Sequence, residues 1–224
     1  MKAIVCVLLS LMLAVSLGVA EAPRNAAQAA KTGGSAPVRV TVLAAGDLMC
    51  LYAQVQAAKT RGGYRFDQCF AGIRQKVSSA DLAIANLETL VASGYPYTGP
   101  KPRSGYTRIN APESFLSAVA GCGFDVLTTA NNHTFDYKAD GIAKTMKKLD
   151  QYGAAHTGAY AAKGDKKPLV RDVKGVRIGI VAYTDVLNDR PPSSAAYMID
   201  VYNAKRAAAD IAALNRALTA APAI

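Results

Sequence analysis

Carboxylate, carboxamide and imidazole side chains follow the apolar segments of this chain at the points where the segments end. Asp47 follows the first segment, Glu88 the second and His133 the third. Other polar residues at these ends are Asn86, Asn131, Asn132, Asp136, Thr184, Asp185 and Asn188. Such oxygen and imidazole donors suit Zn, Mn, Fe or Mg and not a thiolate-preferring metal. We therefore expect a divalent-metal site, in which a carboxylate supplies charge, Asn132 a carbonyl ligand, and His133 a ligand or a proton donor to a leaving group.

Each of these residues also has a structural explanation when it is taken alone. Asp47 can cap a helix, Asn131 and Asn132 can satisfy a turn through side-chain hydrogen bonds to the backbone, and Glu88 can be solvated. His156, the other of the two histidines, can line the same rim or serve as a hydrogen-bonded structural residue. The presence of several such residues at the ends of successive apolar segments favours a shared site.

The elements that must position these residues alternate between strand and helix. Apolar patterning predicts strands at 38–45, 82–85, 125–130 and 176–184, the last in a hairpin with 169–173. Helical spacing is present from Phe66 to Val77, at 112–120, along Ile142, Met146 and Leu149, and at 203–219. Strands separated by helical crossovers indicate an α/β fold with a largely parallel sheet, in which ligands gather where the strands end.

The composition describes a globular domain with a basic surface. Apolar residues make up 51% of the 224 residues, which excludes a disordered or collagen-like chain. The formal net charge of +10 should attract polyanions such as nucleic acid, anionic lipid or an acidic envelope polymer. Nucleic acid is disfavoured, because there is no Trp, the basic residues are dispersed, and no zinc-finger, RRM or helix-turn-helix pattern is present.

The N-terminus has the pattern of a signal peptide. Lys2 precedes an apolar run at 3–20, and small residues suitable for cleavage follow at Ala20 and Ala22. The alternative is an uncleaved membrane anchor, since the run approaches the length that spans a bilayer. We expect a signal peptide at 1–22, a flexible linker at 23–37 and one domain at 38–224, in a protein exported to the cell envelope or the extracellular space.

The cysteines and the longest loop complete the set of candidate functional features. Cys50, Cys69 and Cys122 remain after the signal peptide, so at most one internal disulfide can form, and Cys122 is most simply a small buried residue. The loop after the second strand carries Tyr95, Tyr97, Lys101, Arg103 and Arg108. Long loops at a site rim often bind substrate, and these cations would suit a polycarboxylate; a solvated loop is the alternative.

Three motifs in order resemble a known family. They are Ala45-Gly46-Asp47-Leu48-Met49, Asn86-Leu87-Glu88, and Ala130-Asn131-Asn132-His133-Thr134-Phe135-Asp136-Tyr137, with Gly141 and Thr145 downstream. In order and spacing they resemble the bacterial capsule-synthesis CapA family, also called the poly-γ-glutamate synthesis or PGA-cap family. The resemblance extends from about Val38 to the chain end and includes His156-Thr157-Gly158-Ala159.

The resemblance implies a fold and a set of site residues. The fold is a calcineurin-like metallophosphatase-type β-sandwich flanked by helices. Asp47 and Glu88 would be acidic site residues, and Asn132 with His133 would occupy the place of the metallophosphatase Asn-His pair. His133 and Asp47 are thus the candidate catalytic residues, and the candidate metal ligands are Asp47, Glu88, Asn132 and His133. The candidate substrate-binding residues are Asn86, Asn131, Asp136, His156 and Arg103.

Two departures from the superfamily pattern affect this expectation. Gly46-Asp47-Leu48 lacks the DxH sequence that metallophosphatases have at the first strand. The family continues into an HWGxE-like motif and a later histidine loop, and this chain stops at Ile224 before either. We therefore expect a chain that is truncated at its C-terminus and whose site holds metal weakly.

Three functions are compatible with these features. The first is an exported capsule-synthesis protein that acts in production, transport or anchoring of an anionic envelope polymer such as poly-γ-glutamate, together with capsule synthesis machinery. The second is a metal-dependent phosphoesterase or amide hydrolase in which His133 protonates the leaving group. The third is a non-catalytic module that binds cell-wall polyanions through its charge alone.

Overall fold

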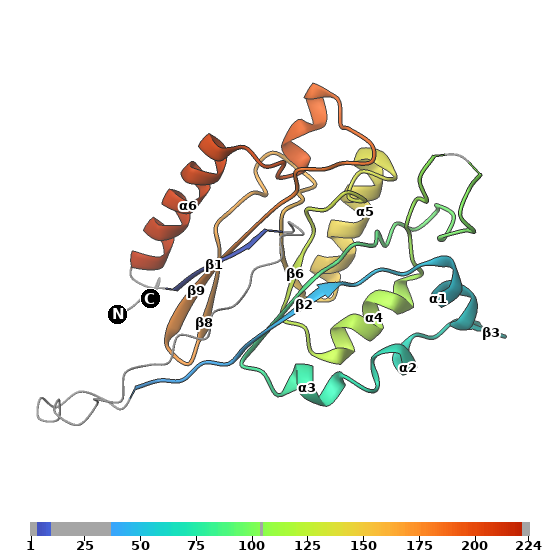
Figure 1. Ribbon diagram of the computed structural model, residues 1–224, viewed down its shortest axis with the longest axis horizontal. Helices are drawn as coiled ribbons and strands as arrows, with labels where there is room; N and C mark the ends of the chain where they lie inside the picture. The colour runs from blue at the N-terminus through green and yellow to red at the C-terminus, as the bar shows by residue number, and fades with distance from the viewer. Residues whose placement is uncertain (1–3, 10–36, 104, 221–224) are drawn as a thin grey trace, which may run out of the picture.

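Two β-sheets pack face to face and have helices on their outer faces (Figure 1). The structure is a computed structural model that describes residues 4–9, 37–103 and 105–220. One sheet has the order β2-β5-β6-β7 and is parallel throughout; its strands are β2 (Val42–Asp47), β5 (Leu82–Asn86), β6 (Val126–Thr128) and β7 (Ala155–Thr157). The other has the order β1-β9-β8, with β1 (Ile4–Leu9), β8 (Leu169–Val173) and β9 (Val176–Tyr183).

The alternation of side chains along β5 explains how its sheet is buried on both faces. Leu82 and Ile84 pack with Val126 against Ile178 and Ile180 of the other sheet. The intervening residues of β5 and β6 face the helices, because successive side chains of a strand point to opposite faces. This second cluster contains Ala83, Ala85 and Leu127, Phe115, Leu116 and Val119 of α4 (Glu113–Cys122), and Ile142, Met146 and Leu149 of α5 (Lys138–Gln151).

The register of the parallel sheet brings the carboxyl ends of its strands to one edge. Asp47 pairs with Asn86, and Asn86 pairs with Thr128 of the next strand. Thr128 in turn pairs with Thr157. The chain segments that leave β2, β5 and β6 therefore start side by side, which is the condition for a site shared among them.

The predicted fold class, an α/β sandwich flanked by helices, is confirmed, and the predicted hairpin is confirmed as well. Lys174 and Gly175 connect β8 to β9 with φ angles of 54° and 78°, as a type I′ turn requires. The last helix, α6 (Ala204–Thr219), is capped by Asn203, whose side chain accepts a hydrogen bond from the backbone N–H of Arg206.

The helical spacing between Phe66 and Val77 does not form one continuous helix. The structure has two short helices there, α2 (Asp67–Phe70) and α3 (Arg74–Ser78), and Ile73 between them is 45% exposed. The first strand of the domain also begins later than predicted, at Val42, and Val38 is exposed. Unpredicted elements are α1 (Tyr52–Ala57), the hairpin of β3 (Lys59–Thr60) and β4 (Gly63–Tyr64), and the 3-10 helix η1 (Ser193–Met198).

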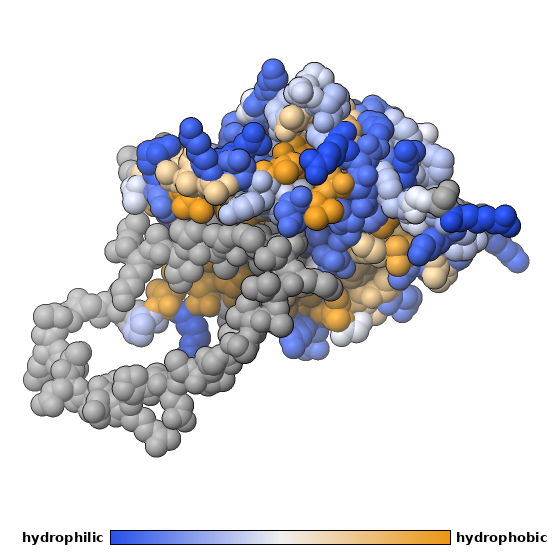
Figure 2. Space-filling view, turned by 45° about the horizontal axis from the view of Figure 1, so that its top comes forward, coloured by the Kyte–Doolittle hydropathy of each residue, from blue (hydrophilic) through white to orange (hydrophobic). Residues whose placement is uncertain are grey.

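The N-terminal segment predicted as a signal peptide contains β1, which pairs in parallel with β9 from Ile4 opposite Ile178 to Leu9 opposite Tyr183. The rest of that segment and nearly all of the predicted linker lie outside the described residues, and signal cleavage stays a prediction. No helix in the described part of the chain is long and apolar enough to cross a membrane. Figure 2 shows hydrophilic residues around smaller hydrophobic patches on one face of the molecule.

Helix α6 is held against β9 by close apolar packing. Leu214 is fully buried and lies over Gly179, where an added Cβ would come within 2.6 Å of the leucine side chain. Val181, Tyr183, Ala207 and Leu218 complete this cluster. The absence of a side chain at Gly179 therefore permits the close approach of α6 to the sheet.

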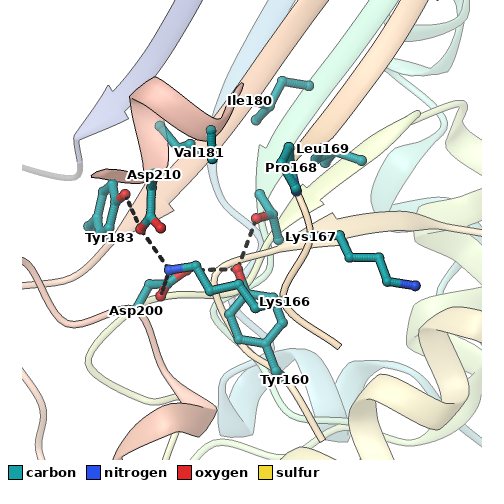
Figure 3. A pocket seen from close by; sticks show the side chains of 12 residues that line it. Tyr160, Lys166, Lys167, Pro168, Leu169, Ile180, Val181, Tyr183, Asp200 and Asp210 are labelled. Carbon is teal, nitrogen blue, oxygen red and sulfur yellow. Dashed lines mark hydrogen bonds and ion pairs between the residues drawn. The ribbon is translucent and has the colours of Figure 1, made fainter. Parts of the chain in front are cut away.

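A polar network next to this packing ties α6 to two loops (Figure 3). The ammonium group of Lys166 lies 2.5 Å from Asp200 and 2.7 Å from Asp210 of α6. Tyr160 donates a hydrogen bond to Asp200, and Tyr183 donates one to Asp210. Burial is the main cause of a raised Asp200 pKa, which the Lys166 and Tyr160 contacts oppose. Lys166 thus compensates two carboxyl groups that are largely withdrawn from water.

We predict that Lys166→Met lowers the free energy of unfolding by about 2 to 4 kcal/mol, because it leaves Asp200 and Asp210 without their cation while it keeps the apolar stem. Urea denaturation measures the difference. Lys167→Met is the matched control, since Lys167 is exposed and its substitution should change stability by less than about 0.5 kcal/mol. Equal stability of the two variants would contradict a stabilising role for the network.

Candidate functional site

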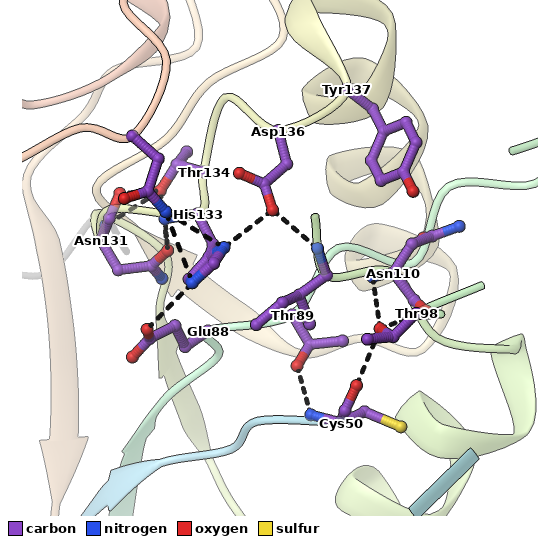
Figure 4. Close-up of polar contacts among 12 residues, drawn as sticks. Cys50, Glu88, Thr89, Thr98, Asn110, Asn131, His133, Thr134, Asp136 and Tyr137 are labelled. Carbon is purple, nitrogen blue, oxygen red and sulfur yellow. Dashed lines mark hydrogen bonds and ion pairs between the residues drawn. The ribbon is translucent and has the colours of Figure 1, made fainter. Parts of the chain in front are cut away.

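His133 lies in the turn between β6 and α5, and Asp136 of the same turn fixes its ring (Figure 4). Nδ1 of His133 lies 2.8 Å from Oδ2 of the fully buried Asp136. That same oxygen accepts a hydrogen bond of 2.7 Å from the backbone N–H of Ile109. With Asp136 as the acceptor, Nδ1 carries the ring proton, and Nε2 is left as a hydrogen-bond acceptor.

Glu88 lies on the Nε2 side of His133. Its Oε1 is 3.8 Å from Nε2, and the Glu88 residue is only 6% exposed. The pKa of Glu88 is raised to about 7. Burial is the largest cause, and a hydrogen-bond contribution and the like charge of Asp47 follow. Glu88 therefore exchanges its proton near neutral pH, beside an imidazole and a second carboxyl group.

Carboxamides connect the ends of the neighbouring strands beneath these groups. The side-chain amide of Asn86 donates a 2.8 Å hydrogen bond to Oδ1 of Asp47. The side-chain amide of Asn131 donates to Oδ1 of Asn86 and to the carbonyl of Leu87. Oδ1 of Asn131 then accepts from the backbone N–H of His133. This series of hydrogen bonds fixes Asp47 relative to His133, although the two lie far apart in the sequence.

Six of the predicted site residues lie within this connected set of contacts: Asp47, Asn86, Glu88, Asn131, His133 and Asp136. Asn132 belongs to the same turn, and its carbonyl accepts a hydrogen bond from the backbone N–H of Asn188. His156 lies within β7, where its Nε2 is 3.1 Å from Asp150 of α5. Arg103 is exposed on its loop. In the described part of the chain, neither His156 nor Arg103 makes a hydrogen bond or ion pair with the connected set.

Two neighbours of His133 come from loops. The side-chain nitrogen of Asn188, which follows β9, is 3.3 Å from Nδ1 and 3.5 Å from Nε2 of His133, and with the ring proton on Nδ1 it can donate only to Nε2. The ring of Tyr106 lies 6.3 Å from the imidazole between centroids, at an angle of 61°. Asn188 was predicted to lie at a strand end, but Tyr106 was not among the predicted site residues. The only sequence signal for Tyr106 was its place in the long loop before α4.

The donor atoms have the chemistry of a divalent-metal site, but their spacing does not match one. Among the residues that the structure describes, no group of three or more His, Cys, Asp and Glu side chains could hold a metal ion. The carboxyl groups of Asp47 and Glu88 lie near enough for Asp47 to raise the pKa of Glu88. Metal binding by Asp47, Glu88, Asn132 and His133 stays a prediction.

The fold and the site together define an α/β sandwich protein with an acidic, histidine-containing site at the ends of parallel strands. The chain belongs to a family of capsule synthesis proteins: the family model described as bacterial capsule synthesis protein PGA_cap matches residues 41–221. The match confirms the resemblance that the three sequence motifs indicated. The finer likeness to metallophosphatases stays a prediction.

Curated relatives match a shorter part of the chain. A protein of Bacillus anthracis named capsule biosynthesis protein CapA is 37% identical over 78 residues, which are 34% of this chain and 19% of that protein. Two uncharacterized proteins of Sinorhizobium fredii (strain NBRC 101917 / NGR234), y4sH and y4uA, are each 30% identical over 92 residues, or 40% of this chain and 20% of theirs. The matches thus span about a fifth of the length of these relatives.

We predict that Glu88→Gln removes a pH dependence of stability. The folded-state pKa of Glu88, about 7, lies above the unfolded value of about 4.3. The folded protein therefore retains a proton that the unfolded chain has released, so this contribution to stability is fully present below about pH 4 and is lost as the pH rises through about 7.

Urea denaturation at about pH 5 and about pH 8 should show that the wild type loses more stability over this interval than Glu88→Gln does. Glu113→Gln is the control, because Glu113 lies on the surface in an ion pair with Lys148. A Glu88→Gln variant with the pH dependence of the wild type would show that Glu88 ionises normally in the folded protein.

Proposed function

We propose that this chain acts, as an exported protein, in the production, transport or anchoring of an anionic envelope polymer of the poly-γ-glutamate kind, together with capsule synthesis machinery. The observation that carries this proposal is the family match over residues 41–221. The N-terminal sequence pattern supports export to the cell envelope or extracellular space.

The charge distribution supports a polyanionic ligand. The whole chain has a net charge of +10. Between Glu88 and Glu113 no acidic residue interrupts the sequence, and the cations of this segment are Lys101, Arg103 and Arg108. The segment reaches the site through Ile109, whose N–H bonds to Asp136. Below about pH 7 a protonated Glu88 lowers the negative charge that an approaching polyanion would meet.

The geometry around His133 also favours a second function, hydrolysis of an amide or phosphoester linkage. Ionised Glu88 would accept the proton of an attacking water, and Nε2 of a protonated His133 would give a proton to the leaving group. Asp136 would hold the imidazole ring and stabilise its charged form. The specific observation that favours this function is the buried Glu88. Its pKa is about 7, and its Oε1 lies 3.8 Å from Nε2 of the imidazole. Divalent metal ions are therefore added in one arm of the hydrolysis assay.

We predict that the protein is retained on immobilised poly-γ-glutamate at low ionic strength, and less so at about 0.15 M salt, where the screening length falls to about 8 Å. The measurement is the retained fraction in each buffer, with a neutral amidated polymer as the control matrix. A change of retention in Asp47→Ala, in either direction, would place the polymer at the site, whereas unchanged retention would favour binding by surface charge alone. No retention at low salt would contradict the proposed function.

We predict that His133→Ala lowers the rate of γ-glutamyl amide or phosphodiester hydrolysis by at least about a hundredfold, because it removes the proton donor. Rates are measured with and without added Mn or Zn. His156→Ala serves for comparison, since His156 contacts Asp150 and not the connected site residues. Asp136→Asn should shift the pH profile of the rate, because Asp136 contacts the ring directly. Equal rates in the wild type and in His133→Ala would contradict the proposed hydrolytic function.

A further inference from the structure

Tyr106 and Arg108 lie beside the site but take no part in the contacts among Glu88, His133 and Asp136. The Tyr106 ring lies 6.3 Å from the His133 ring. The hydroxyl group of Tyr106 is buried and makes no hydrogen bond of good geometry among the residues that the structure describes, although Arg108 and Asp189 lie near it. A buried hydroxyl without a well-formed hydrogen bond is costly, so its presence next to a histidine points to a ligand.

The backbone that follows Tyr106 is held rigidly in place. The N–H of Ile109 bonds to Asp136, as does the His133 ring. Asn110 is fully buried, and its side chain bonds to the backbone of Ala92 through both its oxygen and its nitrogen. Tyr106 and Arg108 therefore stand on a segment whose distance from His133 is fixed before any ligand arrives.

Arg108 is the cation of this segment that interacts with Tyr106. It is exposed and forms no ion pair at salt-bridge distance within the described residues, although the charge of Asp189, which is paired with Lys138, acts on it. A guanidinium group presents a planar fork that matches a carboxylate with two hydrogen bonds. A tyrosine hydroxyl can donate a third.

We propose that Tyr106 and Arg108 form a subsite that binds a free carboxylate of the polymer next to His133. This inference rests on the proposed function. In a γ-linked glutamate polymer the free carboxylate is attached to the same carbon as the amide nitrogen. Binding of that carboxylate by Tyr106 and Arg108 would place the adjoining amide against His133 and Glu88, which is the order in which these residues lie in the structure.

The two histidines of the chain provide a direct readout. Nuclear magnetic resonance of the imidazole nitrogens, recorded during titration with a short γ-glutamyl oligomer, should show shifts at His133. The signals of His156 should stay unchanged, because His156 lies against Asp150 in β7. An oligomer with amidated carboxyl groups should shift neither histidine, since it lacks the carboxylate.

Substitutions then assign the shift to the subsite. Arg108→Gln should weaken binding of the oligomer about tenfold, Arg108→Lys less, and Tyr106→Phe about threefold, because hydrogen bonds to a charged group are strong ones. Arg171→Gln is the matched control for charge, since Arg171 is exposed on β8 of the other sheet, and its effect should stay within about twofold.

The outcomes separate this subsite from the proposed function. If the wild type binds oligomer and polymer but Arg108→Gln behaves like Arg171→Gln, the subsite is overturned and polymer binding stands. If the wild type binds neither, both are overturned. If polyphosphate binds better than the oligomer and shows the same dependence on Arg108, the site takes phosphate, and the assignment of a carboxylate is overturned.

Discussion

One buried oxygen atom, Oδ2 of Asp136, joins the two segments on which the site depends. It accepts a hydrogen bond from the backbone of Ile109 and contacts Nδ1 of His133. The first contact fixes the end of the long loop before α4, and the second fixes the tautomer and direction of the imidazole ring. A single side chain thereby sets both the position of Nε2 of His133 and the position of the segment that carries Tyr106 and Arg108.

The parallel sheet supplies the complementary constraint. The pairing of Asp47 with Asn86 and of Asn86 with Thr128 places three strand ends in line, and apolar contacts on both faces of β5 keep them there. Asn86 and Asn131 then connect these ends by side-chain hydrogen bonds. The capping and turn roles that asparagine often has are thus combined here with alignment of the site, and the two explanations do not exclude each other.

Sequence patterning predicted the strands and the main helices because each has a clear period and a buried face. It failed between Phe66 and Val77, where helical spacing continued across a turn that leaves Ile73 exposed. Strand ends indicated that Asp47, Glu88 and His133 lie close together, as the structure shows, since parallel register follows from topology. The position of Tyr106 depends on where a long loop folds back, and the position of His156 on which face of β7 it occupies. Neither is encoded in local spacing.

The ionisation of Glu88 depends on the charges that surround it. A polyanion that approached Glu88 without a compensating cation would raise the pKa of Glu88 above its already elevated value of about 7, because like charges disfavour ionisation. Glu88 would then keep its proton and could not accept one from water. A cation on the same side as the ligand offsets this effect and allows Glu88 to ionise. In the proposed hydrolysis, a cation of the acid-free segment 89–112 beside the bound polyanion would thus favour the ionised form of Glu88 that can act as a base.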